Sequence, residues 1–441
     1  MTAAEYKRRR RTLCKSIGSG GLAILPAARE VIRNRDVHYP FRQHSDFSYV
    51  TGFPEPNAVA VFMPGRQDGE FILFCRPRDP EREQWDGERI GVEGATERFG
   101  ADQAHPLTEL DAIMPTLIDG CERLYYPIGT DADLDQQVMG WVNQVRAKTR
   151  TGAVAPDTFI TIESLLHEQR LRKTRSELTQ MRRAARISAQ AHRRLMCHCS
   201  PGMKELDLEA DFQHTCVTSG ARFNAYQTIV GSGTNACVLH YIANDGVLRD
   251  GDLVLIDAGC EFDGYASDIT RTFPVNGRFT APQRELYDLV LKAQQAAIDN
   301  ARPGHRWHEP HDAAVRVLTE GLIQLGILSG KVDQLIQDDA YKPYYMHRTG
   351  HWLGMDVHDV GTYQRDGQWR VFEPGMVLTV EPGLYLPDTD AVPASYRRIG
   401  IRIEDDVLIT ETGNDILSAA APKHPDAIEA LMAGHHLRVK S

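Results

Sequence analysis

The chain has 441 residues, of which 42% are hydrophobic and 25% are charged, an ordinary composition for a globular protein. At about 100–200 residues per domain, this length predicts two or three domains. The net charge of −10 argues against nucleic acid or an anionic membrane as a partner. No apolar run approaches the roughly 18–20 residues that span a bilayer, and the eight cysteines are scattered without a C-x-x-C pair. We therefore expect a cytoplasmic protein with reduced thiols and no membrane segment.

The first third of the chain alternates short β-rich runs with polar segments. The runs cover residues 21–25, 58–63, 71–75 and 124–126. A helix is predicted over residues 133–148. The basic cluster at residues 7–11 is predicted to be a solvated helix face rather than a targeting signal, because no apolar stretch or cleavage site follows it. Together these features predict a small α/β domain over residues 1–170.

A second domain is predicted over residues 171–441, after a charged segment. Two capping-box patterns precede apolar residues at helical spacing and mark helix starts: Thr174 with Glu177, and Thr280 with Gln283. Another amphipathic helix is predicted over residues 311–325. Strands are predicted over residues 253–258, 265–275, 376–381 and 399–409. Helices clustered around an antiparallel sheet favour an α+β class for this domain.

Two aspartates in this second domain are predicted to lie side by side. Asp257 ends the apolar run 253–256, where a carboxylate is costly unless it is paired or binds a metal. The dipeptide Asp263-Gly264 then signals a two-residue hairpin, which would place Asp257 opposite Thr270. Asp268 is then diagonal to Asp257 on the same face. Two adjacent carboxylates need a shared proton or a cation. Taken alone, the pattern also fits a solvated hairpin.

Further polar groups collect near the ends of other apolar strands. His347, His351 and His358 fall within twelve residues and alternate with Trp, Leu, Met and Val, which indicates imidazoles that face a pocket. Glu381 ends the apolar run 377–380. Glu404 lies two residues after Arg402 in the run 400–406, so the two side chains share one face of the predicted strand. Four carboxylates with at least one imidazole suit two hard cations better than zinc.

The segments around these residues match one family in order and spacing. The block from residue 347 to residue 359 and the segments around the four carboxylates resemble the proline-specific metallopeptidases of the pita-bread fold. The resemblance covers the whole chain and implies a pita-bread catalytic domain preceded by a smaller α/β domain. It also implies two Mn²⁺ ions per subunit, or other divalent ions, held by Asp257, Asp268, His351, Glu381 and Glu404.

The resemblance further implies roles for residues around the metals. Glu381 would shuttle the proton to the leaving proline nitrogen, and His240 and His358 would stabilise the transition state and hold the substrate. His347 and Arg402 would complete the pocket wall, although a structural role for His347 stays open. Tyr226 and Arg365 are further candidates for substrate binding.

The amino-terminal segment points to one branch of the family. Residues 39–47 with residues 51–53 resemble the amino-terminal domain of bacterial aminopeptidases P. On this resemblance Asp36, Trp85 and Arg150 are expected to bind substrate, Trp85 from an exposed loop that reaches a neighbouring subunit. The expected assembly is therefore a homo-oligomer, specifically a tetramer.

The expected function is an aminopeptidase that hydrolyses the bond before a penultimate proline, by attack of a metal-bridging hydroxide. The main alternative is a prolidase, which cleaves dipeptides, and a non-catalytic peptide-binding module of the same fold is a further one. A methionine aminopeptidase is disfavoured by the long amino-terminal domain. The five intact ligand positions argue against the module and against a creatinase-like hydrolase, in which they are replaced.

Overall fold

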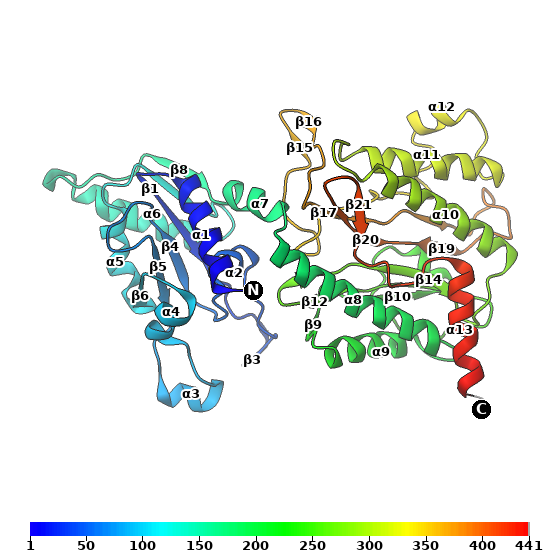
Figure 1. Ribbon diagram of the computed structural model, residues 1–441, viewed down its shortest axis with the longest axis horizontal. Helices are drawn as coiled ribbons and strands as arrows, with labels where there is room; N and C mark the ends of the chain where they lie inside the picture. Colours follow the sequence, from blue (N-terminus) through cyan, green and yellow to red (C-terminus); the bar gives the residue numbers. More distant parts are fainter. Residues whose placement is uncertain (440–441) are drawn as a thin grey trace. The chain divides into compact units, whose positions relative to one another are not determined.

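The structure, a computed structural model, describes residues 1–439 and divides into two compact units, Met1–Gln169 and a second unit that begins at Arg170 (Figure 1). No helix among these residues has the length and apolar character needed to cross a bilayer. All eight cysteines are free thiols.

The first unit is built on a six-stranded mixed sheet in the order β6-β5-β4-β1-β7-β8. Its strands are β1 (Gly21–Pro26), β4 (Val59–Phe62), β5 (Phe71–Cys75), β6 (Gln103–Pro106), β7 (Arg123–Tyr126) and β8 (Thr158–Thr161). The unit also has a small hairpin of β2 (Ile32–Asn34) and β3 (Val37–His38). Its helices are α1 (Ala3–Ile17), α2 (Ser45–Thr51), α3 (Pro80–Asp86), α4 (Gly91–Phe99), α5 (Leu110–Ile118), α6 (Ala132–Ala147) and α7 (Glu163–Leu171), which runs two residues into the second unit.

The basic cluster at the start of the chain differs from its prediction. It lies on α1 as expected, but Arg9 and Arg10 are buried rather than solvated. The Arg9 guanidinium stacks 4.0 Å from the ring centroid of Tyr49 and donates to its carbonyl, while Arg10 lies over Phe71 and donates to the carbonyl of Val50. Cation–π contacts and backbone acceptors compensate the burial of both charges, and Arg9 also forms an ion pair with Glu5 at 3.5 Å.

The second unit combines several antiparallel ladders with helices. Its strands are β9 (Phe223–Asn224), β10 (Ile229–Ser232), β11 (Leu253–Asp257), β12 (Cys260–Phe262), β13 (Tyr265–Ala266), β14 (Thr270–Pro274), β15 (Gln364–Arg365), β16 (Gln368–Trp369), β17 (Val377–Val380), β18 (Gly383–Leu386), β19 (Ile399–Arg402), β20 (Asp405–Ile409) and β21 (Asn414–Ile416). Its helices are α8 (Arg175–His198), α9 (Glu205–Thr218), α10 (Ala281–Asn300), α11 (Glu309–Gln324), α12 (Val332–Gln337) and α13 (Pro425–Val439). Both predicted capping boxes are present, at the starts of α8 and α10.

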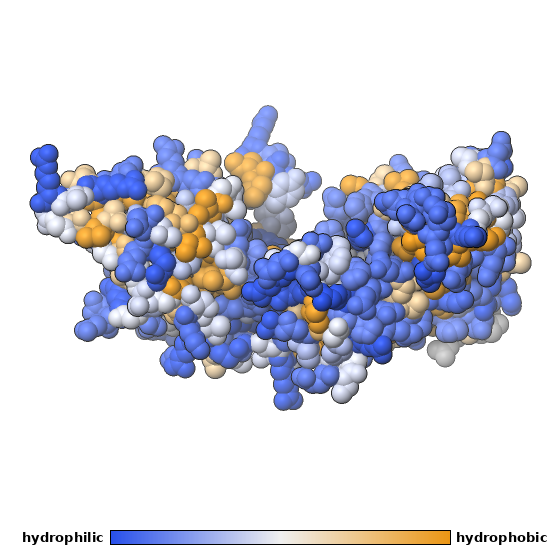
Figure 2. Space-filling model, turned by 90° about the horizontal axis from the view of Figure 1, so that it is seen from above, coloured by the Kyte–Doolittle hydropathy of each residue, from blue (hydrophilic) through white to orange (hydrophobic). Residues whose placement is uncertain are grey.

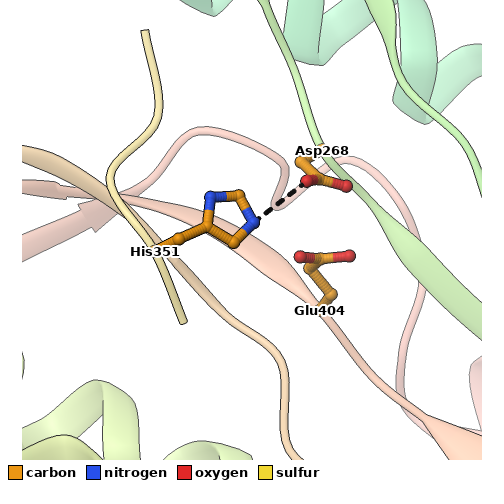
Figure 3. Close-up of side chains that lie close together, drawn as sticks. All are labelled: Asp268, His351 and Glu404. Atoms are coloured by element: carbon orange, nitrogen blue, oxygen red, sulfur yellow. Dashed lines mark ion pairs between the residues drawn. The ribbon is translucent and has the colours of Figure 1, made fainter. Parts of the chain in front are cut away.

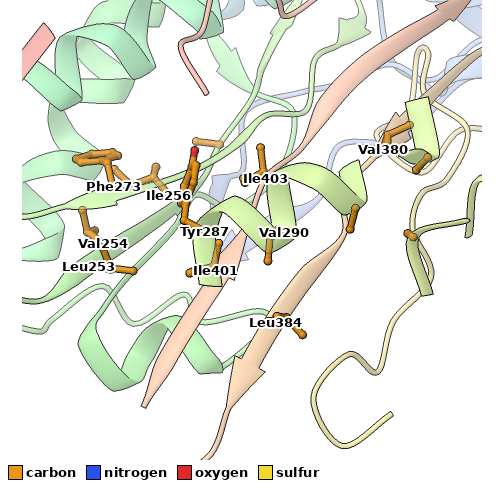
Figure 4. Packing of buried hydrophobic residues seen from close by; sticks show 14 of the residues in the cluster. Leu253, Val254, Ile256, Phe273, Tyr287, Val290, Val380, Leu384, Ile401 and Ile403 are labelled. Carbon is orange, nitrogen blue, oxygen red and sulfur yellow. The ribbon is translucent and has the colours of Figure 1, made fainter. Parts of the chain in front are cut away.

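The core of this unit joins the strands to the helices. Figure 4 shows Leu253, Val254, Ile256 and Phe273 of β11 and β14 together with Tyr287 and Val290 of α10, Ile401 of β19 and Ile403. These side chains are almost completely buried, which fixes the strand ends on which the polar residues lie.

Candidate active site

The second unit contains a cavity of about 670 Å³. Apolar side chains, among them Ile229, Leu239 and Ile242, form part of its lining. All the predicted site residues of this unit except Arg365 also line it, namely Tyr226, His240, Asp257, Asp268, His347, His351, His358, Glu381, Arg402 and Glu404. Residues that are up to 178 positions apart in the sequence, from Tyr226 to Glu404, therefore meet in one place.

The hairpin register brings Asp257 and Asp268 together. Asp257 lies opposite Thr270 in the ladder of β11 and β14, as the sequence predicts. The predicted single strand over residues 265–275 is, however, divided into β13 and β14, which pair in different sheets. Gly259 allows the two chain segments to approach closely where the strand divides, because a Cβ at this position would lie 1.8 Å from the carbonyl oxygen of Ser267. Asp268 leaves the ladder at that point and turns into the cavity.

The other two carboxylates also occupy breaks between strands. Glu381 follows the last residue of β17, and Glu404 lies between β19 and β20, where one strand over residues 399–409 was predicted. The backbone N–H of Glu404 donates to the carbonyl of Thr270, and the Thr270 hydroxyl donates to Oε2 of Glu404 at 2.7 Å. The buried Arg271 guanidinium donates to the Glu404 carbonyl and is also paired with Asp405. Departure from regular pairing thus frees these side chains to face the cavity.

His351 is held by its backbone and by its ring. Its N–H donates to the hydroxyl of Thr379, and its Nδ1 lies 3.0 Å from the carbonyl oxygen of Trp352. That contact assigns the proton to Nδ1 and leaves Nε2 free to bind a metal. Nε2 lies 3.4 Å from Oδ2 of Asp268 and 3.7 Å from Oε1 of Glu381. Figure 3 shows the imidazole directed at Asp268 with Glu404 beside them.

The cavity concentrates negative charge. Its four carboxylates are largely buried and face one buried guanidinium, that of Arg402. Burial raises the pKa of Glu381 to about 7 and raises the pKa of Glu404 well above its usual value, and the neighbouring carboxylates add to both shifts. The hydroxyl of Tyr226 lies 2.6 Å from Oδ1 of Asp257 and 2.5 Å from Oδ1 of Asp268. One phenol proton can go to only one of these carboxylates, so the other must be balanced by the Arg402 guanidinium at Asp257 or by a proton or cation at Asp268.

The donor set fits divalent cations. One ligand atom each from Asp268, His351 and Glu404 lie within 4.8 Å of one another. Asp257 and Glu381 line the same cavity, so oxygen donors predominate over nitrogen and no thiolate takes part. Oxygen-rich sites of this kind suit hard ions such as Mn²⁺ and Mg²⁺. A cation is also the group that would offset the excess of buried carboxylates.

A second network links the polar wall of the cavity. The phenol of Tyr385 accepts from Nη1 of Arg402 at 2.8 Å and lies 2.9 Å from Nε2 of His347. Burial lowers the pKa of His347 to about 3, so this imidazole is neutral. Tyr385 was not among the predicted site residues, although a tyrosine inside the apolar strand β18 is a usable signal, since a buried phenol needs a partner. His358 packs edge-on against His351, with 4.3 Å between the ring centroids.

The remaining predicted residues lie elsewhere. Asp36, Trp85 and Arg150 belong to the first unit. Trp85 is 86% exposed as expected, but it lies on α3 rather than in a loop, because Asp79 caps this helix and Pro80 begins it. Arg365 is an exposed residue of β15 and is not among the described residues that line the cavity, since β15 and β16 form a separate two-residue hairpin.

Comparisons with known proteins match nearly the whole chain. The family described as Metallopeptidase family M24 matches residues 179–411, and Aminopeptidase P, N-terminal domain, matches residues 6–125. The chain is 48% identical to the Xaa-Pro aminopeptidase of Escherichia coli over 97% of both chains. A structure of Pseudomonas aeruginosa aminopeptidase PepP matches 99% of both chains at 53% identity with a TM-score of 0.98. A zinc-substituted E. coli aminopeptidase P in complex with product matches 99% of both chains at 47% identity with a TM-score of 0.96. These matches confirm the predicted fold class.

Proposed function

The chain belongs to metallopeptidase family M24, and we infer from this membership and from its cavity that it is an Xaa-Pro aminopeptidase. Such an enzyme is a hydrolase that removes the first residue from peptides whose second residue is proline. The observation that carries this conclusion is the group of buried carboxylates around the imidazole of His351 in a single cavity, on a chain that matches aminopeptidases P from end to end. The prolidase alternative is not favoured by these relatives.

We propose that Asp257, Asp268, His351, Glu381 and Glu404 hold two divalent ions, with Mn²⁺ as the expected metal. The excess of buried carboxylates supports more than one cation. When bound, such ions polarise the substrate carbonyl and supply an activated water for its hydrolysis. The zinc-substituted E. coli relative indicates that other divalent ions are to be compared with manganese.

The side chains around the metals have distinct proposed tasks. The Glu381 carboxyl lines the cavity beside His351 and is proposed to take the proton of the attacking water and give it to the proline nitrogen. That nitrogen must take up a proton to leave as an amine, as in the hydrolysis of any peptide bond. His240 and His358 border the cavity as donors to the substrate carbonyl, and Arg402 with His347 forms its polar wall.

Residues 171–441 are proposed as the catalytic domain and residues 1–170 as a domain that takes part in assembly. Asp36, Tyr226 and Arg365 are proposed as further substrate contacts, Arg365 from the exposed hairpin outside the cavity. We propose a homotetramer in which Trp85 and Arg150 reach the substrate site of a neighbouring subunit. The exposure of Trp85 supports this, as do the half-exposed apolar side chains of the hairpin that includes β2 and β3, namely Val31, Ile32, Val37 and Tyr39. Figure 2 shows hydrophobic residues gathered on the first unit, at the left, within a mainly hydrophilic face.

The eight free thiols support a cytoplasmic location.

Substrate length tests this function against its main alternative. A prolidase must bind the carboxylate of a terminal proline, whereas an aminopeptidase must leave the peptide an open exit. With the manganese-loaded protein, kcat/KM for an X-Pro-Y tripeptide should exceed that for the matched X-Pro dipeptide by about tenfold or more. A dipeptide that is hydrolysed tenfold better would replace the aminopeptidase with a prolidase.

A further inference from the structure

A buried ionic cluster lies beside the cavity but does not line it. Nζ of Lys173 lies 2.9 Å from Oδ2 of Asp359, and Nη2 of Arg170 lies 2.6 Å from Oδ1 of the same carboxylate. The side chains of these three residues are at most 2% exposed. Nη2 of Arg170 also lies 2.7 Å from Oδ2 of Asp356. The cluster joins the start of the second unit to a segment more than 180 residues further along the chain.

The carboxylate in this cluster belongs to the loop that carries two site histidines. Residues 351–360 form neither helix nor strand, apart from an isolated bridge at Trp352. Backbone hydrogen bonds to β17 hold the start of this loop, since the Thr379 N–H donates to the His351 carbonyl and the Leu353 N–H donates to the Val377 carbonyl. Residues 354–360 lie beyond this pairing. His358 directly precedes Asp359, and its ring packs against His351. The part of the loop that carries His358 and Asp359 therefore depends on side-chain and local backbone contacts for its shape.

A short chain of contacts leads from the cluster to the His351 ring. The backbone N–H of Asp359 donates to the carbonyl oxygen of Trp352 at 2.9 Å. The same oxygen lies 3.0 Å from Nδ1 of His351, which sets the tautomer that exposes Nε2. Gly354 packs against the cluster so closely that a Cβ there would lie 2.1 Å from Oδ2 of Asp359. The backbone of Asp359 is thus one of the groups that hold the carbonyl oxygen of Trp352 in place for the His351 ring.

We propose that Lys173 and Arg170 are positioning residues that orient His351 and His358 through Asp359. Burial of charges is costly and well-packed apolar side chains often replace such clusters without loss of stability, so a role in geometry accounts for charges at this place. The proposal rests on the metallopeptidase function inferred above, because it assigns His351 to a metal. Lys173 and Arg170 are not among the residues that line the cavity, so they would affect metal and substrate only through the two histidines.

The test compares Lys173→Met with Arg172→Met. Arg172 is the neighbouring residue, and it forms an ion pair with Glu373 that is nearly half exposed on both sides. In Lys173→Met we expect a 10- to 100-fold weaker binding of Mn²⁺ to the apo-protein and a comparable fall in kcat at saturating metal, with a smaller change in KM. Lys173→Arg should restore most of both losses. Arg172→Met should stay within about twofold of the wild type in both, since exposed ion pairs contribute little.

Each outcome decides the proposal. If folded Lys173→Met binds Mn²⁺ and turns over like Arg172→Met, the cluster only stabilises the fold and the proposal is wrong. If Lys173→Met does not fold, Asp359→Asn decides, because it keeps the side-chain shape and leaves Arg170 paired with Asp356. Unchanged Mn²⁺ affinity and kcat in folded Asp359→Asn would overturn the proposal. Failure of the wild type to cleave X-Pro-Y would contradict the proposed function instead, and the comparison of metal affinities would still stand.

Discussion

Nη2 of Arg402 lies 2.7 Å from Oδ2 of Asp257, and both side chains line the cavity. The guanidinium also donates to the phenol of Tyr385 and to the hydroxyl of Thr270, which in turn donates to Glu404. One arginine therefore connects a carboxylate at the end of β11, a tyrosine of β18 and the carboxylate between β19 and β20.

Replacement of this arginine tests the network. Arg402→Met leaves Asp257 without its cation, so kcat/KM should fall about 100-fold, the cost of losing a charged hydrogen bond of about 2–3 kcal/mol. Arg402→Lys should recover only part of the loss, because a lysine cannot reproduce the planar fork. Steady-state kinetics on the metal-loaded variants measures both effects. Equal kcat/KM in wild type and Arg402→Met would contradict this role.

Gly350 allows the close approach that places His351. A Cβ at this position would lie 2.0 Å from the carbonyl oxygen of Thr379, so Gly350→Ala must displace the loop or β17. We expect at least about tenfold weaker Mn²⁺ binding, because a shifted ligand loses its geometry. Calorimetric titration of the apo-protein gives the affinity. Gly413→Ala is the matched control, since nothing lies within 4 Å of its added Cβ. Equal affinities in the two variants would mean that the loop adapts without cost.

A buried histidine should make stability depend on pH. Burial lowers the pKa of His192, which is completely inaccessible, to about 4 from an ordinary 6.5. Between pH 4 and pH 6.5 the unfolded chain binds a proton that the folded chain does not, so the free energy of unfolding falls as pH falls through this window. The loss at pH 4 is on the order of 3 kcal/mol, at about 1.4 kcal/mol per pKa unit.

Urea unfolding of the apo-protein at several pH values measures this dependence. His192→Gln removes the titrating group, so its stability should change less between pH 7 and pH 4 than that of the wild type. If the two proteins lose the same free energy over this range, His192 is not the source of the pH dependence.

Assembly is expected to involve the exposed tryptophan of α3. Trp85→Ala should lower the activity of the oligomer without lowering its melting temperature, because the side chain packs against little within its own unit. Light scattering at the assay concentration should give a tetramer for the wild type. A monomer with full activity would rule out a contribution from a neighbouring subunit.

The sequence predicted the site best where a local rule set the geometry. The Asp263-Gly264 turn fixes the register, and this alone places Asp257 opposite Thr270. Thr174 and Thr280 begin their helices as their capping boxes predict. Resemblance to a family then supplied the proposed metal ligands on distant segments, which no periodicity could connect.

The failures have a common physical cause, which is that tertiary contacts override local patterns. The predicted strand over residues 399–409 is broken at Glu404, because the chain there bonds to Thr270 instead of continuing its own ladder. Arg9 can be buried because its guanidinium lies over the ring of Tyr49, 40 residues away in the chain, and donates to the carbonyl of that residue. Tyr385 was missed because an apolar strand conceals one polar atom.

The most direct test of the central claim is the metal content of Asp268→Asn measured beside its activity. Asp268 is buried, hydrogen-bonded to Tyr226 and adjacent to His351, so its charge should be essential for holding the ions. Elemental analysis should find two equivalents of divalent metal in the wild type and loss of metal in Asp268→Asn, with turnover lost in parallel. Two full equivalents of metal in this variant, with unchanged turnover, would contradict the assignment of the cavity as a dimetal active site.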